Sequence, residues 1–263
     1  MKKIAFFVEG ETEYIFISWL LKKIASSKGI DVSIVANKLE GGGRKKPIRV
    51  ATLRLESTII PHAKYEALIQ VAGTDHRISP SLEDTNIDTD IENFHKSLQS
   101  TNSENEYSLI IGLRDLKGEK PDSTPFTLAD LPKMELLSKV TIRNCVLKDI
   151  IPTSIIIAVY EIEAWFLAEC THFQRVDSIL TNTFVTSNMG FNPCIDDMTL
   201  RPEPAVDLHN AYQLGRPPKS YSKKKSHIER TINSLDYAYL YDKIRHDIAK
   251  VNELVTKIDT FLT

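Results

Sequence analysis

Several acidic side chains stand just after short apolar runs, at positions from which their carboxylates could act together. These acids are Glu9, Asp75, Asp115, Glu161 and Glu163. The runs that they follow are residues 4–8, 67–71, 107–113 and 154–160, and continuous apolar runs of this length are typical of strands buried on both faces. In an open parallel sheet, ligands bind at the edge where the carboxyl ends of the strands meet. We therefore expect the carboxylates to converge there, although a single acid after a strand is usually a solvated loop residue.

Such a cluster would repel itself unless a cation lay within it, because neighbouring negative charges disfavour joint ionisation. Hard oxygen ligands without a nearby set of cysteines and histidines favour Mg²⁺ or Mn²⁺ over zinc. Magnesium takes one or two protein carboxylates and leaves its other positions to water and phosphate oxygens. The pattern therefore predicts a site for Mg²⁺ (or Mn²⁺) of the kind that cleaves phosphodiesters.

Segments with helical spacing of apolar residues separate these runs. They are residues 14–24, 87–100 and, in part, 128–150. Residues 31–36 form a weaker additional strand candidate. Strands that alternate with helices predict an α/β fold with a mainly parallel sheet and flanking helices.

The character of the chain changes after Trp165. Polar, proline-bearing loops alternate from there on with helical stretches, such as residues 226–244 and 248–262. We expect residues 1–165 to form the catalytic domain and residues 166–263 to form a mainly helical C-terminal lobe.

The segment that follows the first apolar run has the composition of a strand-to-helix turn. Gly10 permits a tight turn that a Cβ would obstruct. Thr12 is well placed to cap the helix that follows, and Glu11 and Glu13 are favourably placed against its dipole. Glu11 and Glu13 are therefore either capping charges only or members of the acidic site. Glu9 is harder to explain by capping, since a helix needs no acid at the end of the preceding strand.

The composition is that of a globular protein without a membrane-spanning segment. Of 263 residues, 42% are hydrophobic and 26% charged, and the formal net charge of -2 gives no global attraction to nucleic acid. The apolar runs are too short for a signal peptide or a membrane span. Cys145, Cys170 and Cys194 are odd in number and far apart, which predicts reduced thiols. We expect a soluble cytoplasmic protein.

Two basic stretches could contact nucleic acid. In GGGRKKPIR, Arg44, Lys45 and Lys46 follow three glycines, but the Lys-Ser or Lys-Thr of a Walker A motif is missing, so this stretch is either a mobile loop or a phosphate contact. Residues 215–230 carry six cations against one anion and are either a solvated face or a nucleic-acid contact. The lysines of this second stretch are Lys219, Lys223, Lys224 and Lys225. Tyr221 lies among them and could stack on a base.

The segment FFVEGETE, followed by a helix and then by an apolar strand that ends in RD, resembles the TOPRIM catalytic domain of topoisomerases, primases and OLD-type nucleases. More narrowly, the motifs VEGETE, IIGLRD and EIEAWFLAE, in this order, are similar to those of a family of small TOPRIM-like proteins found in bacterial defence loci, often beside an ABC-type or AAA-type ATPase. The resemblance extends over most of the chain, and VEGxTE combined with EIEAWFLA carries it. It implies a TOPRIM or Rossmann-like sheet, bound Mg²⁺ and nuclease activity.

Residue by residue, the resemblance makes Glu9 the acid after the first strand, a metal ligand or general base. It makes Glu13 the second acid of the first motif and a ligand. Asp115 takes the first place of the family's D-x-D pattern, but Lys117 stands in the second place instead of an acid. Lys117 would then contact phosphate in a one-metal site, unless another acid substitutes as ligand. The acids that could substitute are Glu119, Glu161 and Glu163.

The resulting hypothesis is a Mg²⁺-dependent TOPRIM-type nuclease that cleaves phosphodiesters in DNA or RNA. In nucleases of this fold a lysine stabilises the charge that develops on phosphate, and Lys223 or Lys224 is the candidate here. The resemblance implies the effector of an antiphage defence system that works with a partner ATPase, and it leaves homo-oligomerisation open. Two alternatives stay open. One is a catalytically degenerate TOPRIM-fold binding or scaffold subunit of such an ATPase complex. The other is a metal-dependent phosphatase or nucleotidyl-transfer enzyme that acts on small nucleotides.

Overall fold

The computed structural model describes residues 1–40, 50–72, 86–116 and 124–263. Within these residues six strands form one sheet, in the order β3-β2-β4-β1-β5-β6. The strands are β1 (Lys2–Val8), β2 (Val32–Glu40), β3 (Val50–Arg54), β4 (Tyr65–Val71), β5 (Tyr107–Asp115) and β6 (Thr153–Ala158). All neighbouring strands run parallel except β2 and β3, which are antiparallel. The predicted α/β fold with a mainly parallel sheet is confirmed.

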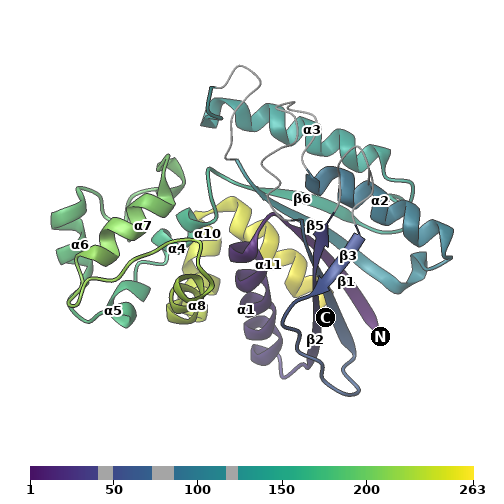
Figure 1. Ribbon diagram of the computed structural model, residues 1–263, viewed down its shortest axis with the longest axis horizontal. Helices are drawn as coiled ribbons and strands as arrows, with labels where there is room; N and C mark the ends of the chain where they lie inside the picture. The colour runs from purple at the N-terminus through teal and green to yellow at the C-terminus, as the bar shows by residue number, and fades with distance from the viewer. Residues whose placement is uncertain (41–49, 73–85, 117–123) are drawn as a thin grey trace.

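Helices cover both faces of the sheet (Figure 1). The described helices are α1 (Glu11–Ser27), α2 (Asn86–Ser100), α3 (Leu131–Asn144), α4 (Glu163–Ala168), α5 (His172–Val176), α6 (Asn182–Met189), α7 (Pro204–Gln213), α8 (Lys225–Ser234), α9 (Tyr237–Tyr239), α10 (Arg245–Asp247) and α11 (Ala249–Phe261). α2 and α3 pack on one face, and α1 and α11 pack on the other. α5 to α8 gather beside this sandwich, at the left of Figure 1.

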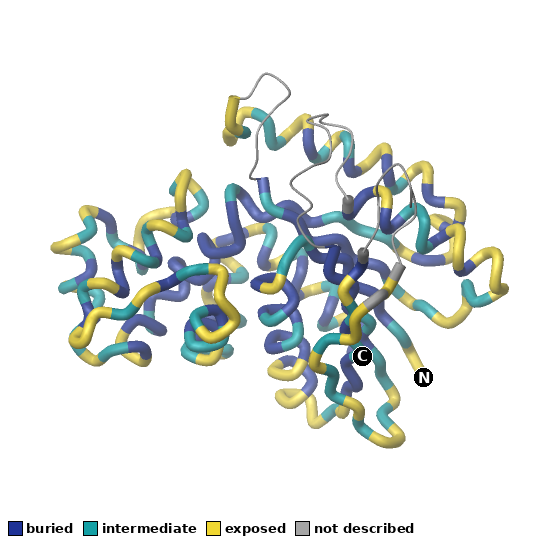
Figure 2. Tube along the Cα trace, viewed as in Figure 1, coloured by how far each residue is buried: buried dark blue, intermediate teal, exposed yellow. Residues whose placement is uncertain are grey.

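Side chains of the central strand β1 alternate between the two faces, and both faces are buried. Phe6 belongs to the core that α1 and α11 cover. Phe7 belongs to the opposite core, where its ring meets Phe94 of α2 edge-on, with the ring centroids 5.3 Å apart. Figure 2 shows the central strands as mainly buried. Burial on both faces explains why the first strand is apolar at successive positions.

The last helix of the chain helps to close the core of the sheet. α11 contacts β6 and α1, and the ring of Phe261 meets that of Tyr65 edge-on at 5.5 Å. One apolar cluster runs from β1 through α1 into α7 and α11. The boundary predicted at residue 165 falls inside α4. Elements from before and after residue 165 therefore share one core.

Two features differ from the sequence-based expectation. The edge strand β3 carries no continuous apolar run, and its Leu53 is 55% exposed, so the pattern of a buried strand is missing. Cys170 and Cys194 form a disulfide, so the prediction of three free thiols is wrong. The two cysteines are 24 residues apart, and α5 and α6 turn the chain so that they meet.

Among the described residues, no helix combines the length and the apolarity needed to cross a bilayer.

We expect a side chain at Gly112 on β5 to crowd the packing around this strand. A Cβ there would lie 2.9 Å from Ile91 Cδ1, 3.0 Å from Ile87 Cγ2 and 3.2 Å from Ile155 Cγ1. Gly112→Ala should lower the free energy of unfolding by about 1–3 kcal/mol, because an overpacked core forces its neighbours out of their rotamers. Urea denaturation measures this change. The control Ser108→Ala, at an exposed position of the same strand, should shift the free energy by less than about 0.5 kcal/mol. Equal small effects in both variants would contradict close packing of α2 on β5.

Candidate metal centre

Neighbouring strands bring three acids together at one edge of the sheet. β5 is parallel to β6, so their carboxyl ends meet; Asp115 ends β5, and Glu161 and Glu163 follow β6. One carboxylate oxygen from each of these three acids lies within 4.8 Å of the other two. Adjacent and opposite ligands of an octahedral Mg²⁺, with bonds of about 2.1 Å, are about 3.0 and 4.2 Å apart, so the three oxygens would have to lie closer than this upper bound to bind one ion. The three carboxylates lie together as expected, and metal binding by them stays a prediction.

A strained turn after β6 directs two of these acids back over the sheet. Tyr160 has a φ of 58°, in the left-handed region that residues with a Cβ rarely occupy. Two residues later the N–H of Ile162 donates to Asp115 Oδ1 at 3.0 Å, which fastens the turn to the end of β5. α4 then begins at Glu163. Glu161 and Glu163 are therefore held beside Asp115 by backbone geometry.

Glu9 stands at the same edge, directly after β1. Its Oε2 accepts a hydrogen bond from the N–H of Asp115 at 3.4 Å. Burial raises the pKa of Glu9, and the nearby Arg114 opposes this shift. The guanidinium of Arg114 pairs with Asp88 of α2 at 3.5 Å. Arg114 was not among the residues predicted from the sequence. Side chains alternate along a strand, so Arg114 points away from Asp115, and this alternation was the one feature that could have identified it.

Glu13 both caps α1 and belongs to the acidic group. The N-cap of α1 is Gly10, whose backbone is extended, so the prediction that Thr12 caps the helix is wrong. The helix begins two residues earlier than a Thr12 cap requires, at Glu11. Glu13 Oε2 accepts the N–H of Gly10 at 2.9 Å, and the residue is only 3% exposed. A purely capping acid has no need of such burial.

Glu163 is fully buried, and one of its oxygens is unused. Its Oε1 accepts a hydrogen bond from the Tyr221 hydroxyl at 2.6 Å and is 2.6 Å from Lys223 Nζ. Its Oε2 is buried with no hydrogen-bond partner among the described residues. A buried acceptor without a partner is costly, and such an oxygen within a group of acids suits a cation. Tyr221 is itself buried, so the prediction that it stacks on a base is wrong.

Lys223 supplies positive charge to this group, but not enough for all of the acids. Burial disfavours its ammonium, yet the charges of Glu163, Glu13 and Asp115 outweigh burial and raise the pKa of Lys223. Burial raises the pKa of Glu13 to about 7, with Lys223 opposing and Glu163 reinforcing the shift. Burial, together with the charges of Glu13 and Glu9, raises the pKa of Asp115 well above its usual range. The group therefore favours further positive charge, either protons or a metal ion.

The other nominated residues do not join this group in the described part of the chain. Lys219 Nζ pairs with Asp177 at 3.0 Å, and Lys225 Nζ pairs with Glu56 at 3.1 Å. Lys224 is exposed and immediately precedes α8. The candidates that lie outside the described residues are Arg44, Lys45, Lys46, Asp75, Lys117 and Glu119.

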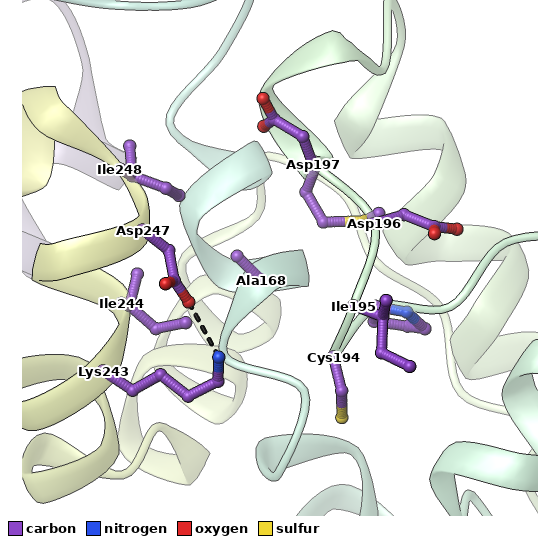
Figure 3. Close-up of a pocket in the computed structure, with 11 residues that line it drawn as sticks. Ala168, Cys194, Ile195, Asp196, Asp197, Lys243, Ile244, Asp247 and Ile248 are labelled. Atoms are coloured by element: carbon purple, nitrogen blue, oxygen red, sulfur yellow. Dashed lines mark hydrogen bonds and ion pairs between the residues drawn. The ribbon is translucent and has the colours of Figure 1, made fainter.

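A separate cavity of about 490 Å³ lies between the loop that carries Cys194 and the turn before α10 (Figure 3). In its wall Lys243 Nζ pairs with Asp247 at 2.9 Å, as the dashed line in Figure 3 shows. Its other two acids, Asp196 and Asp197, each accept a backbone N–H. These carboxylates already have donors, which sets them apart from Glu163 Oε2.

We expect Glu13→Gln to reduce the pH dependence of stability. Because the pKa of Glu13 is raised in the folded state, the folded protein holds this proton more tightly than the unfolded chain does. The stabilisation is complete below about pH 4.5 and is lost as the pH rises through about 7. The free energy of unfolding of Glu13→Gln, relative to wild type, should therefore rise over this interval by at most about 3 kcal/mol.

Urea denaturation of the metal-free protein between pH 4.5 and pH 8 measures this difference. Glu11→Gln, in the same turn but exposed, is the control and should follow the wild-type pH profile. A pH-independent difference between Glu13→Gln and wild type would show that Glu13 does not hold its proton as the structure implies.

No protein-family model matches the sequence, no curated protein matches it, and no solved structure matches it. The candidate centre combines acids at the ends of adjacent parallel strands with the ammonium of Lys223 and with a buried carboxylate oxygen that has no hydrogen-bond partner among the described residues.

Proposed function

We propose that this protein is a divalent-metal-dependent nuclease that hydrolyses phosphodiesters in DNA or RNA. The observation that carries the proposal is the buried Oε2 of Glu163, which has no hydrogen-bond partner among the described residues, on a residue whose carboxylate groups with those of Asp115 and Glu161. Mg²⁺ and Mn²⁺ prefer such oxygen ligands and keep coordination positions for water and phosphate. The resemblance of the three motifs to the TOPRIM domain supports the same chemistry.

Asp115, Glu161 and Glu163 would hold the ion, with Glu9 and Glu13 beside it. When bound, such an ion polarises a phosphate oxygen and lowers the pKa of water. Glu9 is suited to accept the proton of the attacking water, because burial raises the pKa of its carboxyl and so makes the carboxylate a stronger base.

Lys223 is suited to stabilise the negative charge that develops on the phosphate. Its side chain is 50% exposed, although its ammonium lies 2.6 Å from Glu163. If a metal ion neutralises the charge of the acids, this flexible side chain is free to donate to a phosphate oxygen instead. We favour Lys223 over Lys224 because Lys223 contacts the acids.

We further propose that this nuclease is the effector of a defence system that works with a partner ATPase, as the family resemblance implies. A second candidate is a scaffold subunit without catalysis, and one observation favours it. The ammonium of Lys223 already stands at Glu163, where a permanent internal cation could replace the metal ion.

Removal of a ligand carboxylate is expected to abolish cleavage. Glu163→Gln and Asp115→Asn should each lower Mn²⁺-dependent cleavage of plasmid DNA or total RNA at least about 100-fold, because charge in the transition state loses its stabilisation. The assay uses the full chain, alone and with a neighbouring ATPase. Glu106→Gln removes a carboxylate just before the opposite end of β5 and should retain wild-type cleavage. Undiminished cleavage by Glu163→Gln would refute a nuclease built on this centre.

Lys223→Gln is expected to separate metal binding from turnover. Without the competing ammonium, Mn²⁺ should bind roughly tenfold more tightly, whereas cleavage should fall because the phosphate loses a cation. Calorimetry measures binding and the nuclease assay measures turnover. Lys224→Gln, the adjacent lysine, should leave Mn²⁺ affinity unchanged. The scaffold candidate is the better one if Asp115→Asn leaves Mn²⁺ binding unchanged, both in wild type and in Lys223→Gln.

A further inference from the structure

A tyrosine from the C-terminal part of the chain completes the surroundings of Glu163. Tyr221 is 4% exposed and lies in the loop between α7 and α8. Its hydroxyl donates to Glu163 Oε1 at 2.6 Å. The sequence separation between the two residues is 58, so this contact exists only because the chain folds back over the edge of the sheet.

The position of Tyr221 is fixed independently of the acids. His209 Nδ1, on α7, lies 3.0 Å from the carbonyl oxygen of Tyr221 and 3.2 Å from its amide nitrogen. The ring of Tyr212 meets the ring of Tyr221 edge-on at 6.4 Å. The Tyr221 hydroxyl therefore reaches Glu163 from a well-packed support.

Tyr221 and Lys223 both contact Oε1 of Glu163 but differ in their freedom to move. They are two residues apart in the loop before α8, and both of their side chains reach Glu163, whereas Ser222 between them pairs with His227 at 2.9 Å. Both contact Oε1 of Glu163, which leaves Oε2 bare. The long side chain of Lys223 is half exposed and can move away, but the buried Tyr221 cannot.

We propose that Tyr221 is a positioning residue of the metal centre: it holds Oε1 of Glu163, so that Oε2 faces the cation, and it continues to do so after Lys223 has moved to the phosphate. This inference rests on the proposed function. Ligating carboxylates are oriented by hydrogen bonds from outside the coordination sphere, and loss of such a partner typically costs about 10- to 100-fold in metal affinity. Phenylalanine at position 221 would keep the packing and remove only the hydroxyl.

Calorimetric titration of Mn²⁺ into the full chain tests this role. Tyr221→Phe should weaken Mn²⁺ binding roughly 10- to 100-fold and change the electron paramagnetic resonance spectrum of the bound ion, because Glu163 is free to turn. The matched control is Tyr212→Phe, which removes the hydroxyl of the neighbouring buried tyrosine. That variant should bind Mn²⁺ within about twofold of wild type, since it keeps the ring that packs on Tyr221 and loses only a hydroxyl that donates to Thr231.

Two outcomes would overturn the inference while the metal centre survives. One is equal Mn²⁺ affinity in Tyr221→Phe and wild type. The other is an equal loss in both phenylalanine variants, which would reflect general loss of packing. Thermal denaturation checks that each variant is folded; should Tyr221→Phe not fold, His209→Ala, which loosens the backbone of Tyr221, takes its place with the same expectation.

Failure of the proposed function would look different: wild type would cleave no nucleic acid, and if the metal centre itself were wrong, wild type would also bind no Mn²⁺. A crystal structure of metal-free Tyr221→Phe decides the positioning role in that case. A changed side-chain orientation of Glu163 supports it, and an unchanged orientation refutes it.

Discussion

The acids at this edge of the sheet can share a buried space only because an ammonium reaches them from far along the chain. Parallel strands deliver the carboxylates side by side, and burial strengthens their mutual repulsion. Lys223 meets Glu163 at 2.6 Å and Glu161 at 3.8 Å, and it comes from the segment just before α8. The ends of the strands therefore contribute the acids and the loop before α8 contributes the compensating charge, so the centre needs both parts of the chain.

Burial alone does not mark an acid as functional, as Glu169 at the end of α4 illustrates. Glu169 is fully buried like Glu163, but both of its oxygens are used. Oε1 accepts the backbone N–H of Thr171 at 3.2 Å, and Oε2 accepts from Arg175 at 3.1 Å and from the N–H of Asp236 at 3.0 Å. This carboxylate joins α4 to the chain around α9 and has a structural role. The two carboxylates differ in their hydrogen bonds: Glu163 Oε2 has no such donor among the described residues.

The sheet and most of its acids could be predicted because both depend on local patterns. Continuous apolar runs mark buried strands, and the intervening helices imply a parallel order that puts Glu9, Asp115 and Glu161 at one edge. The donor from Tyr221 could not be predicted, since a tyrosine among lysines looks exposed and its partner, Glu163, is 58 residues away. The disulfide could not be predicted for the same reason, because its two cysteines are brought together only by the helices between them. The antiparallel edge strand lacks the apolar pattern that identifies the others.

The left-handed conformation of Tyr160 has a consequence for how this sequence can change. Holding a residue with a Cβ in that region costs about 1–2 kcal/mol, which the surrounding packing must supply. Selection for thermostability alone would favour glycine or asparagine at this position. Glycine would also let the backbone adopt other turns, and Glu161 and Glu163 would lose their fixed direction. Tyr160 thus keeps the turn rigid at a cost to the stability of the fold. Thermostable variants found by screening should be checked for substitutions at this position, because these would leave the side chains of Glu161 and Glu163 less well oriented.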